Sequence, residues 1–436
     1  MEIEELYQIY KECRSISTDT RKLVPGSMFF ALKGDNFDGN QFALDALKKG
    51  CSYAVVDDPG VVHAKYARHL KYVPDAIQSL QSLAAYHRSQ LKVPFIGITG
   101  SNGKTTTKEL LSAVLSRKYK VCATHGNLNN HIGVPLTILS VFDHEIAIIE
   151  MGANHIGEIA ALCKIADPTF GIITNIGKAH LEGFGSVEGV ARAKSELFDH
   201  LARRNAKAFV DSDNPLLLKL AKDRMLKTVC YGGGPASVCT GEIMDNNTFL
   251  NASIHLKGSS EKLDVRSSLI GSYNLSNLLA AACIGNYFGV NPAQIGSALN
   301  EYVPSNSRSQ LVKTLKNKIV LDAYNANPSS MAGSIKNFLS LKEDLPKMLI
   351  LGDMLELGKY SNREHLAIIE LLKEEKVTNI LLVGPEFFAV SGKSSISSFK
   401  KVEDLINYLN LHPVIDHLIL LKGSRGIKLE KLIEVL

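Results

Sequence analysis

The sequence predicts an α/β protein built from several domains. Its 436 residues, 45% of them hydrophobic, are enough for two to four domains that each bury a core of their own. A glycine-rich turn stands between a strand-like and a helix-like segment at residues 97–109. Over the last third of the chain, strand-like and helix-like segments alternate, which is typical of an open parallel sheet covered by helices.

The chain divides into three regions, residues 1–92, 93–304 and 305–436. The first region mixes short strands with the turn-rich segment TDTRKLVPGSMFFALKGDNFDGNQF. The second begins with the strand PFIGIT, the glycine turn and a helix that starts at Thr105. It continues with strand-length apolar runs separated by helical patterns, at residues 145–152, 170–177 and 206–213. This order predicts a mainly parallel sheet in the second region.

The third region follows the linker-like segment EYVPSNSRSQ and repeats a simple rhythm. Four strand-length runs alternate with helical segments: KIVLDAYN, KMLILGDM, NILLVGPE and HLILLKGS. We therefore predict an open α/β sheet here as well. Polar residues gather where these runs end, namely Asp322, Asp353, Lys422, Ser424 and Arg425. The carboxyl ends of parallel strands line the ligand crevice, so these residues are candidates for ligand contacts, although strand ends that simply meet water also turn polar.

Charge and cysteine content exclude several classes of protein. The net charge of +5 is spread along the chain, with no basic cluster of the kind that binds nucleic acid. The seven cysteines are scattered and never form a CxxC pair, which favours reduced thiols over disulfides or a zinc site. The N-terminus MEIEELYQIYKE is unlike a signal peptide, and no apolar run approaches the roughly 20 residues that span a bilayer. We expect a cytoplasmic protein without a membrane span, acting as a monomer on small-molecule substrates.

The segment GITGSNGKTTTKE carries the strongest functional signal. Gly100 and Gly103 permit a tight turn whose amide groups can converge on phosphate oxygens, and the dipole of the following helix favours the same anion. Lys104 supplies a charge for the terminal phosphates, and Thr105 is placed for a magnesium ion. The strict GxxxxGK pattern requires glycine where this chain has Ile98. A buried strand before GKT and a helix after it predict nucleotide binding; the alternative is a purely structural turn.

Two further side chains follow predicted strands of the second region. Glu150 stands at the end of the apolar run IAIIE, where an acidic metal ligand of a phosphate-loop enzyme is expected. His180, in NIGKAHLEGFG, follows the next strand in the same manner and is a candidate ligand at the same sheet edge. The alternatives are a strand-end carboxylate paired with a lysine and a structural histidine.

Lys194 is out of phase with the helix that carries it. In VEGVARAKSELFDHL, helical spacing places this lysine in the middle of an apolar stripe. The stripe consists of Val187, Val190, Ala191, Leu197, Phe198 and Leu201. Such a lysine can extend its amine to solvent or pair with a glutamate. Alternatively, burial can lower its pKa so that the neutral amine reacts with carbon dioxide to give a carbamate, a possible metal ligand. Periodicity does not choose between these alternatives.

These residues belong to a set of motifs that resembles the Mur ligases of peptidoglycan synthesis. The motifs run along essentially the whole chain in the family's order: TGSNGKTTTKE, GNLNNHIGVPLT, IIEMGANHIGEI, NIGKAHLEGFGS, AKSELF, GSYNLSNLLAA, DAYNANPSSM and LGDMLELG. Within the family, YNANP and LGDMLELG resemble the members that act on UDP-N-acetylmuramoyl-tripeptide and D-alanyl-D-alanine. The DNPR-type signature expected of the diamino-acid-adding relative is absent from this sequence.

The resemblance implies a fold and a reaction. It implies an N-terminal UDP-sugar domain at 1–92, a central parallel-sheet phosphate-loop ATPase at 93–304, and a C-terminal Rossmann-like domain at 305–436. ATP would phosphorylate the peptide carboxylate, the incoming amine would attack the acyl phosphate, and phosphate would leave. Closure of the C-terminal domain would exclude water, which otherwise hydrolyses the acyl phosphate.

The resemblance also assigns roles to individual residues. ATP would be held by Gly100, Ser101, Asn102, Gly103, Lys104, Thr105, Thr106, Asn129, Asn130, Asn274, Asn277, Arg308 and Asp322. One Mg²⁺ would bind Thr105 and Glu150, and a second would bind His180 and Lys194, which matches the lysine that is carbamylated in the family. Substrate contacts would come from Thr20, Arg21, Asn40, Asn325 and Asp353. The residues expected to act in the reaction itself are Lys104, Lys194, His180 and Asp322.

Two alternative functions stay open. The first is another amide ligase of the same superfamily, such as the diamino-acid-adding enzyme or a folylpolyglutamate synthetase. The second is a nucleotide-dependent switch that uses the same phosphate loop but has no use for a lysine in the apolar stripe of a helix.

Overall fold

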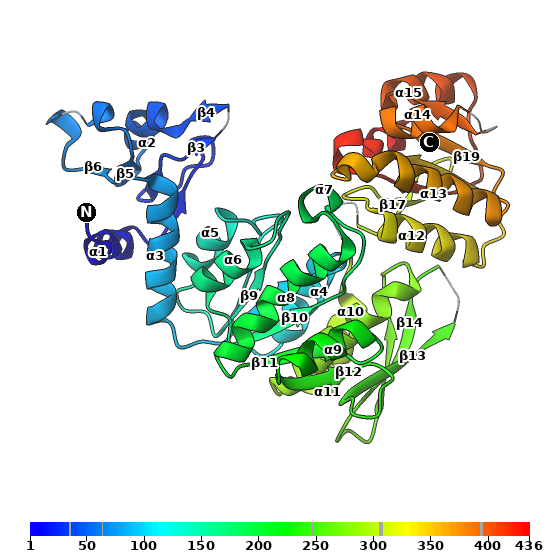
Figure 1. Cartoon of the computed structure of the whole chain (residues 1–436), viewed down its shortest axis with the longest axis horizontal. Coiled ribbons are helices and arrows are strands. Elements are labelled where there is room, and N and C mark those ends of the chain that lie inside the picture. The colour runs from blue at the N-terminus through cyan, green and yellow to red at the C-terminus, as the bar shows by residue number, and fades with distance from the viewer. Residues whose placement is uncertain (35, 63, 246–247, 305–307, 393–395) are drawn as a thin grey trace.

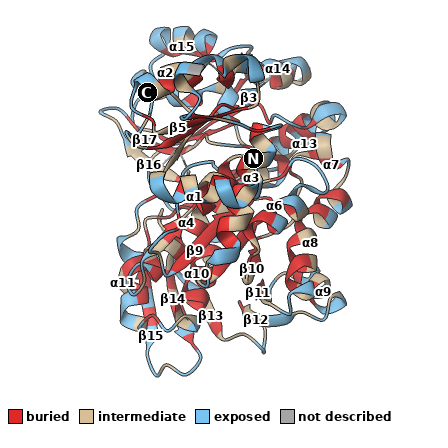
Figure 2. Ribbon diagram, turned by 90° about the vertical axis from the view of Figure 1, so that its left-hand side faces the viewer, coloured by how far each residue is buried: buried red, intermediate tan, exposed pale blue. Residues whose placement is uncertain are grey.

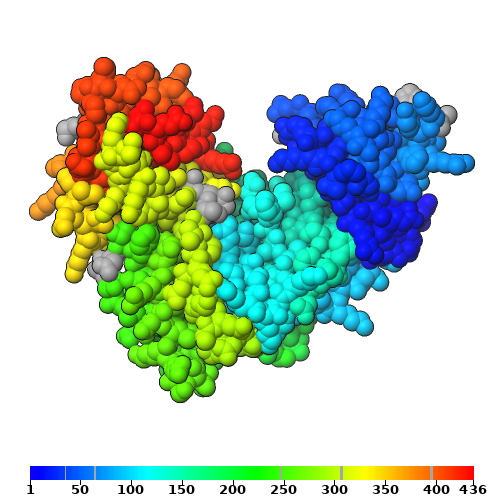
Figure 3. Space-filling view, turned by 180° about the vertical axis from the view of Figure 1, so that it is seen from behind, coloured from blue at the N-terminus to red at the C-terminus, as the bar shows by residue number. Residues whose placement is uncertain are grey.

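The computed structural model describes residues 1–34, 36–62, 64–245, 248–304, 308–392 and 396–436. The chain forms three blocks, each built around its own sheet (Figure 1). The N-terminal and C-terminal blocks stand on either side of the central block, and the molecule is hollowed between them (Figure 3). No helix in the described ranges has both the length and the apolar character needed to cross a membrane.

The N-terminal block contains a parallel four-stranded sheet in the order β1-β2-β5-β6. These strands are β1 (Ile16–Ser17), β2 (Met28–Phe30), β5 (Tyr53–Val56) and β6 (Leu70–Tyr72), and a hairpin of β3 (Lys33–Gly34) and β4 (Phe37–Asp38) follows β2. The helices are α1 (Ile3–Cys13), α2 (Ala43–Lys48) and α3 (Ala76–Gln90). Every residue of β2 is buried because helices cover both faces of the sheet.

The central block contains a nine-stranded sheet in the order β15-β14-β13-β12-β11-β10-β7-β9-β8. The strands are β7 (Phe95–Thr99), β8 (Val121–Ala123), β9 (Ile146–Glu150), β10 (Phe170–Ile173), β11 (Lys207–Asp211), β12 (Lys227–Tyr231), β13 (Cys239–Asp245), β14 (Asn251–Leu256) and β15 (Lys262–Arg266). The strands from β8 to β13 pair in parallel, as predicted, whereas β13, β14 and β15 form an antiparallel extension that the sequence analysis did not foresee.

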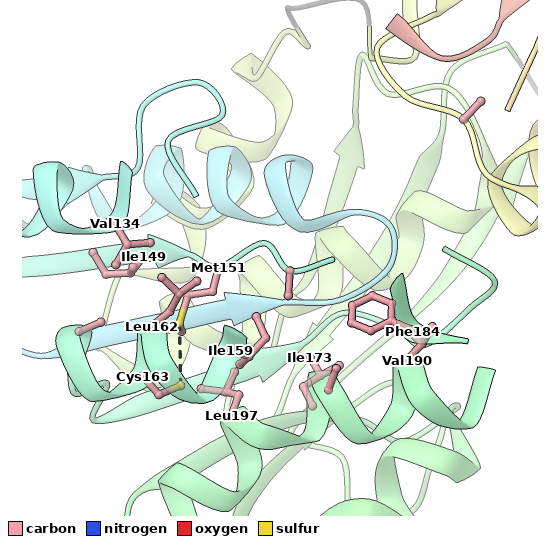
Figure 4. Packing of buried hydrophobic residues seen from close by; sticks show 14 of the residues in the cluster. Val134, Ile149, Met151, Ile159, Leu162, Cys163, Ile173, Phe184, Val190 and Leu197 are labelled. Atoms are coloured by element: carbon pink, nitrogen blue, oxygen red, sulfur yellow. Dashed lines mark hydrogen bonds between the residues drawn. The ribbon is translucent and has the colours of Figure 1, made fainter. Parts of the chain in front are cut away.

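Helices cover both faces of the central sheet. They are α4 (Lys104–Leu115), α5 (Gly133–Ile138), α6 (Glu158–Ala166), α7 (Leu181–Phe184), α8 (Val187–Arg203), α9 (Pro215–Asp223), α10 (Leu275–Tyr287) and α11 (Pro292–Glu301). Figure 4 shows part of the core beneath α6 and α8, where the Cys163 thiol donates to the Met151 sulfur at 3.9 Å. Helix α8 begins where the Ser186 side chain accepts a hydrogen bond from the Gly189 amide, which satisfies one of its free N–H groups.

The C-terminal block contains a six-stranded sheet in the order β16-β17-β21-β18-β19-β20. Its strands are β16 (Gln310–Lys313), β17 (Lys318–Asp322), β18 (Lys347–Gly352), β19 (Ile380–Val383), β20 (Ser397–Phe399) and β21 (Leu418–Lys422). All neighbours are parallel except the edge strand β16. Helices α12 (Pro328–Ser340), α13 (Ser361–Glu374), α14 (Pro385–Ser391) and α15 (Val402–Leu411) complete the block. The four strands predicted here are confirmed, and most of their residues are buried. Figure 2 shows the same pattern over the molecule, with buried residues on strands such as β9 and exposed residues on the outer sides of the helices.

Candidate active site

A cavity of about 900 Å³ lies between the central and C-terminal blocks. The carboxyl ends of strands from both sheets open into it, as expected for parallel α/β sheets. It brings together most of the predicted site residues: Ser101, Asn102, Gly103, Lys104, Thr105, Thr106, Asn129, Asn130, Glu150, His180, Asn274, Asn277, Arg308, Asp322 and Asn325.

The phosphate turn between β7 and α4 is held in a conformation that requires glycine. Gly100 has φ +147° and Gly103 has φ +78°, both in the region that side chains rarely adopt. A Cβ atom at Gly100 would lie 2.0 Å from the Thr174 hydroxyl, and one at Gly103 would lie 2.7 Å from the Asn277 side-chain oxygen. Gly100 therefore does not line the cavity itself but allows the turn to pack against β10.

Lys104 is the first residue of α4, so its backbone belongs to the first helical turn, whose N–H groups have no partner within the helix. The amine donates to the Gly100 carbonyl at 2.7 Å. Burial lowers the pKa of Lys104, Glu150 opposes this shift, and Arg308 adds to it. A half-buried cation at the start of a helix forms a site for phosphate, because an anion would offset its partly lost hydration.

Glu150 ends β9 inside the cavity and is 1% exposed. One carboxylate oxygen, Oε1, accepts hydrogen bonds from the Asn129 amide at 2.8 Å and from the Thr105 hydroxyl at 3.2 Å. The other, Oε2, is buried and has no hydrogen-bond partner among the described residues. A buried carboxylate oxygen without a donor is unfavourable unless a cation or water satisfies it. The carboxylate and hydroxyl oxygens are ligands of the kind that Mg²⁺ prefers, so these residues fit the predicted ion.

His180 lies on the loop between β10 and α7, with a left-handed backbone conformation at φ +49°. Its Nδ1 lies 2.5 Å from Glu356 Oε2 of the C-terminal block. The two atoms are in contact, but their geometry is not that of a hydrogen bond. The imidazole holds the pKa of Glu356 below its ordinary value. Within the described ranges, no three His, Cys, Asp or Glu side chains are grouped to hold a metal.

Lys194 is fully buried on α8, as its place in the apolar stripe predicts. Its amine donates to the Ala153 carbonyl at 3.3 Å and lies 5.1 Å from the centre of the Phe184 ring. Burial is the largest cause that lowers its pKa to about 7, and the charge of Lys104 adds to the effect. Lys194 does not itself line the cavity, although Ala153 does. About half of the amine is therefore in its neutral, nucleophilic form near pH 7.

A chain of amides lines the cavity next to the phosphate turn. The Asn277 side chain donates to Asn274 Oδ1 at 2.8 Å and accepts from the Thr107 hydroxyl at 3.1 Å, while Asn274 donates to the Ile270 carbonyl. This series of side-chain hydrogen bonds links α10 to α4, and both asparagines line the cavity. Asn130 also reaches the wall, where its side-chain oxygen accepts from the Gly133 amide at the start of α5.

The C-terminal block contributes an ion pair and a stacked cation. The Lys422 amine, 1% exposed, lies 2.6 Å from Asp322 Oδ2, which also accepts from the Ser334 hydroxyl at 3.0 Å. The Arg308 guanidinium carbon lies 3.7 Å from the centre of the Tyr324 ring. These groups place fixed charges and an aromatic face opposite the phosphate turn.

Four predicted substrate contacts do not reach this cavity. Asp353 is fully buried at the end of β18, where it accepts from the backbone amides of Glu386 and Phe387 at 2.9 and 2.8 Å. Asp353 therefore caps the N-terminal end of α14. Thr20, Arg21 and Asn40 lie in the N-terminal block and outside the cavity lining. The Asn40 side-chain amide donates to Asp38 and Asp57, which fixes the orientation of this side chain within the block.

Several cavity residues were missed by the sequence analysis. Asp211 ends β11 and accepts from the Ser276 hydroxyl at 2.5 Å, next to the asparagines of α10. The others include Asn214, Tyr273, Tyr324 and Glu356. The end of the predicted strand AKAFVDSD could have indicated Asp211, because strand ends were the criterion used for Glu150. Tyr273 and Tyr324 have no such signal, since only the docking of two blocks brings their rings to one cavity.

Three family models match successive parts of the chain. They are described as "Mur ligase family, catalytic domain" over residues 12–88, "Mur ligase middle domain" over 98–285, and "Mur ligase, glutamate ligase domain" over 307–425. The UDP-N-acetylmuramoyl-tripeptide--D-alanyl-D-alanine ligase of Bacillus subtilis is 35% identical to this chain, and the match covers 96% of this chain and 92% of the relative.

Solved structures agree with these matches. MurF from Acinetobacter baumannii superimposes with a TM-score of 0.86 at 31% identity, covering 99% of this chain and 97% of its own. The MurF ligase of Thermotoga maritima, solved in complex with ADP, superimposes with a TM-score of 0.83 at 28% identity, covering 98% and 97% of the two chains.

Proposed function

Because the chain belongs to the Mur ligase family, we propose that it is the ATP-dependent ligase that joins D-alanyl-D-alanine to UDP-N-acetylmuramoyl-tripeptide. The product is the UDP-muramoyl-pentapeptide of peptidoglycan synthesis. The observation that carries the proposal is the cavity between two blocks, with a phosphate turn on one wall and charged groups of the C-terminal sheet on the other. A cavity of this kind would bring the phosphates of ATP together with the reacting ends of the two other substrates.

The reaction proceeds in two steps. The terminal carboxylate of the tripeptide attacks the γ-phosphorus of ATP, the bond from that phosphorus to the bridging oxygen breaks, and ADP leaves. The amine of D-alanyl-D-alanine then attacks the acyl carbon, phosphate leaves, and the amine loses a proton as the amide forms. Lys104 and the N-terminus of α4 stabilise the charge that collects when two anions meet.

Mg²⁺ fits the oxygen ligands at the end of β9. Thr105 and Glu150 would hold one ion, and the unpartnered Glu150 oxygen is available to it. His180 and a carbamylated Lys194 would hold a second. When bound, these ions supply positive charge to the phosphate oxygens. The pKa of Lys194, about 7, supports carbamylation because only the neutral amine adds carbon dioxide.

Three features of the protein remain part of the proposal. The domains divide near residue 92, between α3 and β7, and near residue 304, which lies in the sequence between α11 and β16. The N-terminal domain holds the uridine diphosphate through Thr20, Arg21 and Asn40. The enzyme acts as a cytoplasmic monomer.

The test measures phosphate release by the purified chain with ATP, UDP-N-acetylmuramoyl-tripeptide and one candidate amine at a time. We expect release only when both the tripeptide and D-alanyl-D-alanine are present. Turnover with lysine, diaminopimelate or glutamate in place of D-alanyl-D-alanine would favour a different amide ligase. Turnover of ATP without any amine would favour a nucleotide-dependent switch.

A further inference from the structure

The loop of residues 177–185, which we name the docking loop, belongs to the central block and contacts the C-terminal block. The Lys178 amine donates to both carboxylate oxygens of Glu364, at 3.0 and 2.9 Å. The Lys178 backbone amide donates to the Ser329 hydroxyl at 2.9 Å, and the Tyr360 hydroxyl donates to the Gly185 carbonyl at 2.6 Å. Figure 1 shows α7, which forms part of this loop, reaching toward the C-terminal block.

The two side chains of the Lys178–Glu364 ion pair differ in their exposure to solvent. The Glu364 side chain is 4% exposed, whereas that of Lys178 is 41% exposed. Glu364 stands in the first turn of α13, where the helix dipole favours a carboxylate. Lys178 supplies the cation from the other block, so separating the blocks would remove its two hydrogen bonds from Glu364. Arg363, at 3.9 Å and mostly exposed, is a weaker neighbour of the same carboxylate.

The docking loop also fixes how the two cavity walls face each other. His180 lies on this loop, and its contact with Glu356 crosses between the blocks. A second crossing joins the walls directly, because the Asn327 amide donates to Asn102 Oδ1 of the phosphate turn at 2.8 Å. Neither Lys178 nor Glu364 lines the cavity. Their effect on the cavity is therefore through the position of the C-terminal block.

We propose that Lys178 and Glu364 are positioning residues of the ligase reaction. Their ion pair holds the C-terminal block on the docking loop in the orientation in which both walls contact the substrates. The inference rests on the proposed function, because it concerns the step at which the amine must reach the acyl phosphate. A reacting pair that is displaced by about 1 Å loses rate by up to about 100-fold, so a contact remote from the chemistry can control it.

The experiment reverses the charges one at a time and then together. The variants are Lys178→Glu, Glu364→Lys and the double exchange, in the full chain. The matched control exchanges Lys431 and Glu403, an ion pair at 2.8 Å within the C-terminal block. Steady-state kinetics give kcat and KM for D-alanyl-D-alanine, ATP binding is measured separately, and small-angle X-ray scattering gives the radius of gyration.

We expect each single reversal to lower kcat/KM for D-alanyl-D-alanine by about 10- to 100-fold and to increase the radius of gyration. Affinity for ATP should fall less than kcat/KM, because the phosphate turn lies in the central block. The double exchange should restore most of the lost kcat/KM and reverse most of the increase in the radius of gyration. The control exchange should leave all three quantities unchanged. Single variants with wild-type kinetics, or a double exchange no better than the singles, would overturn the proposal.

Milder variants keep the test decisive if a reversed charge prevents folding. Glu364→Gln retains the shape of the side chain, and Tyr360→Phe removes only the hydroxyl that donates to Gly185. Both should expand the molecule and lower kcat/KM in the same direction, and wild-type values for both would refute the positioning role. Failure of the proposed function is distinguishable, since it would be seen in the unaltered chain as an absence of turnover with D-alanyl-D-alanine.

Discussion

Replacing Lys194 by arginine keeps a positive charge on α8 but removes the amine that a carbamate requires. The reaction R–NH₂ + CO₂ → R–NH–COO⁻ + H⁺ needs the neutral amine, and arginine is always protonated in proteins. We expect Lys194→Arg to lose at least about 100-fold in kcat, because the proposed carbamate ligand of the second Mg²⁺ can no longer form. Lys194→Met, which fits the apolar surroundings, should lose as much activity without loss of stability.

The fraction of the Lys194 amine that is neutral follows from its pKa, which burial lowers from 10.5 to about 7. At pH 7 about half of the amine is neutral, compared with about one part in 3,000 for a lysine with the ordinary pKa of 10.5. The neutral fraction thus rises about a thousandfold. It should fall to about one tenth at pH 6 and reach about nine tenths at pH 8.

The same shift makes the stability of the carbon dioxide-free protein depend on pH. Because the folded pKa is below the unfolded one, the unfolded state binds more protons between pH 7 and 10.5. The free energy of unfolding should therefore rise with pH across this window, by up to about 1.4 kcal/mol per unit, and level off below pH 7. Denaturant titrations should show this slope for the wild type and its loss in Lys194→Met.

The assay is ¹³C NMR of the protein in ¹³C-bicarbonate, with kinetics in parallel. A carbamate resonance should be present at pH 8, weaken at pH 6 and be absent from Lys194→Arg. Removing dissolved carbon dioxide should lower the activity of the wild type and leave the variants unchanged. An active wild type without the resonance, or wild-type turnover in Lys194→Arg, would refute the reasoning.

Three other substitutions test separate parts of the site. Lys104→Ala should lower ATP turnover at least about 100-fold, since it removes the cation beside the phosphate turn, and circular dichroism should show an unchanged fold. Glu150→Gln should raise the Mg²⁺ concentration needed for half-maximal activity by about tenfold or more, measured by metal titration, and an unchanged requirement would argue against metal binding there. Asp353→Ala should destabilise the protein by about 1–3 kcal/mol in denaturant titrations, because two backbone amides of α14 lose their acceptor, while KM values stay within about twofold.

The sequence predicts the local parts of this site well. The strand, turn and helix around Lys104 are encoded within a dozen residues, and the burial of Lys194 follows from the spacing of its own helix. The antiparallel strands β13, β14 and β15 were missed because they form one end of the sheet, where alternating burial gives shorter apolar signals than a covered strand does. The assignment of Asp353 to the substrate rested on its position at a strand end. The structure shows that such a carboxylate can instead cap the next helix.

The wall contributed by the C-terminal block is harder to predict, for a physical reason. The hydrogen bond from Asn327 to Asn102 joins residues 225 positions apart, and the pair of Lys178 and Glu364 joins residues 186 apart. No local periodicity encodes such contacts, since each partner looks like an ordinary polar residue in its own segment. Phosphate binding is therefore predictable from one short segment. The wall that faces the phosphate turn depends on how two sheets are held together, and so on contacts such as those of the docking loop.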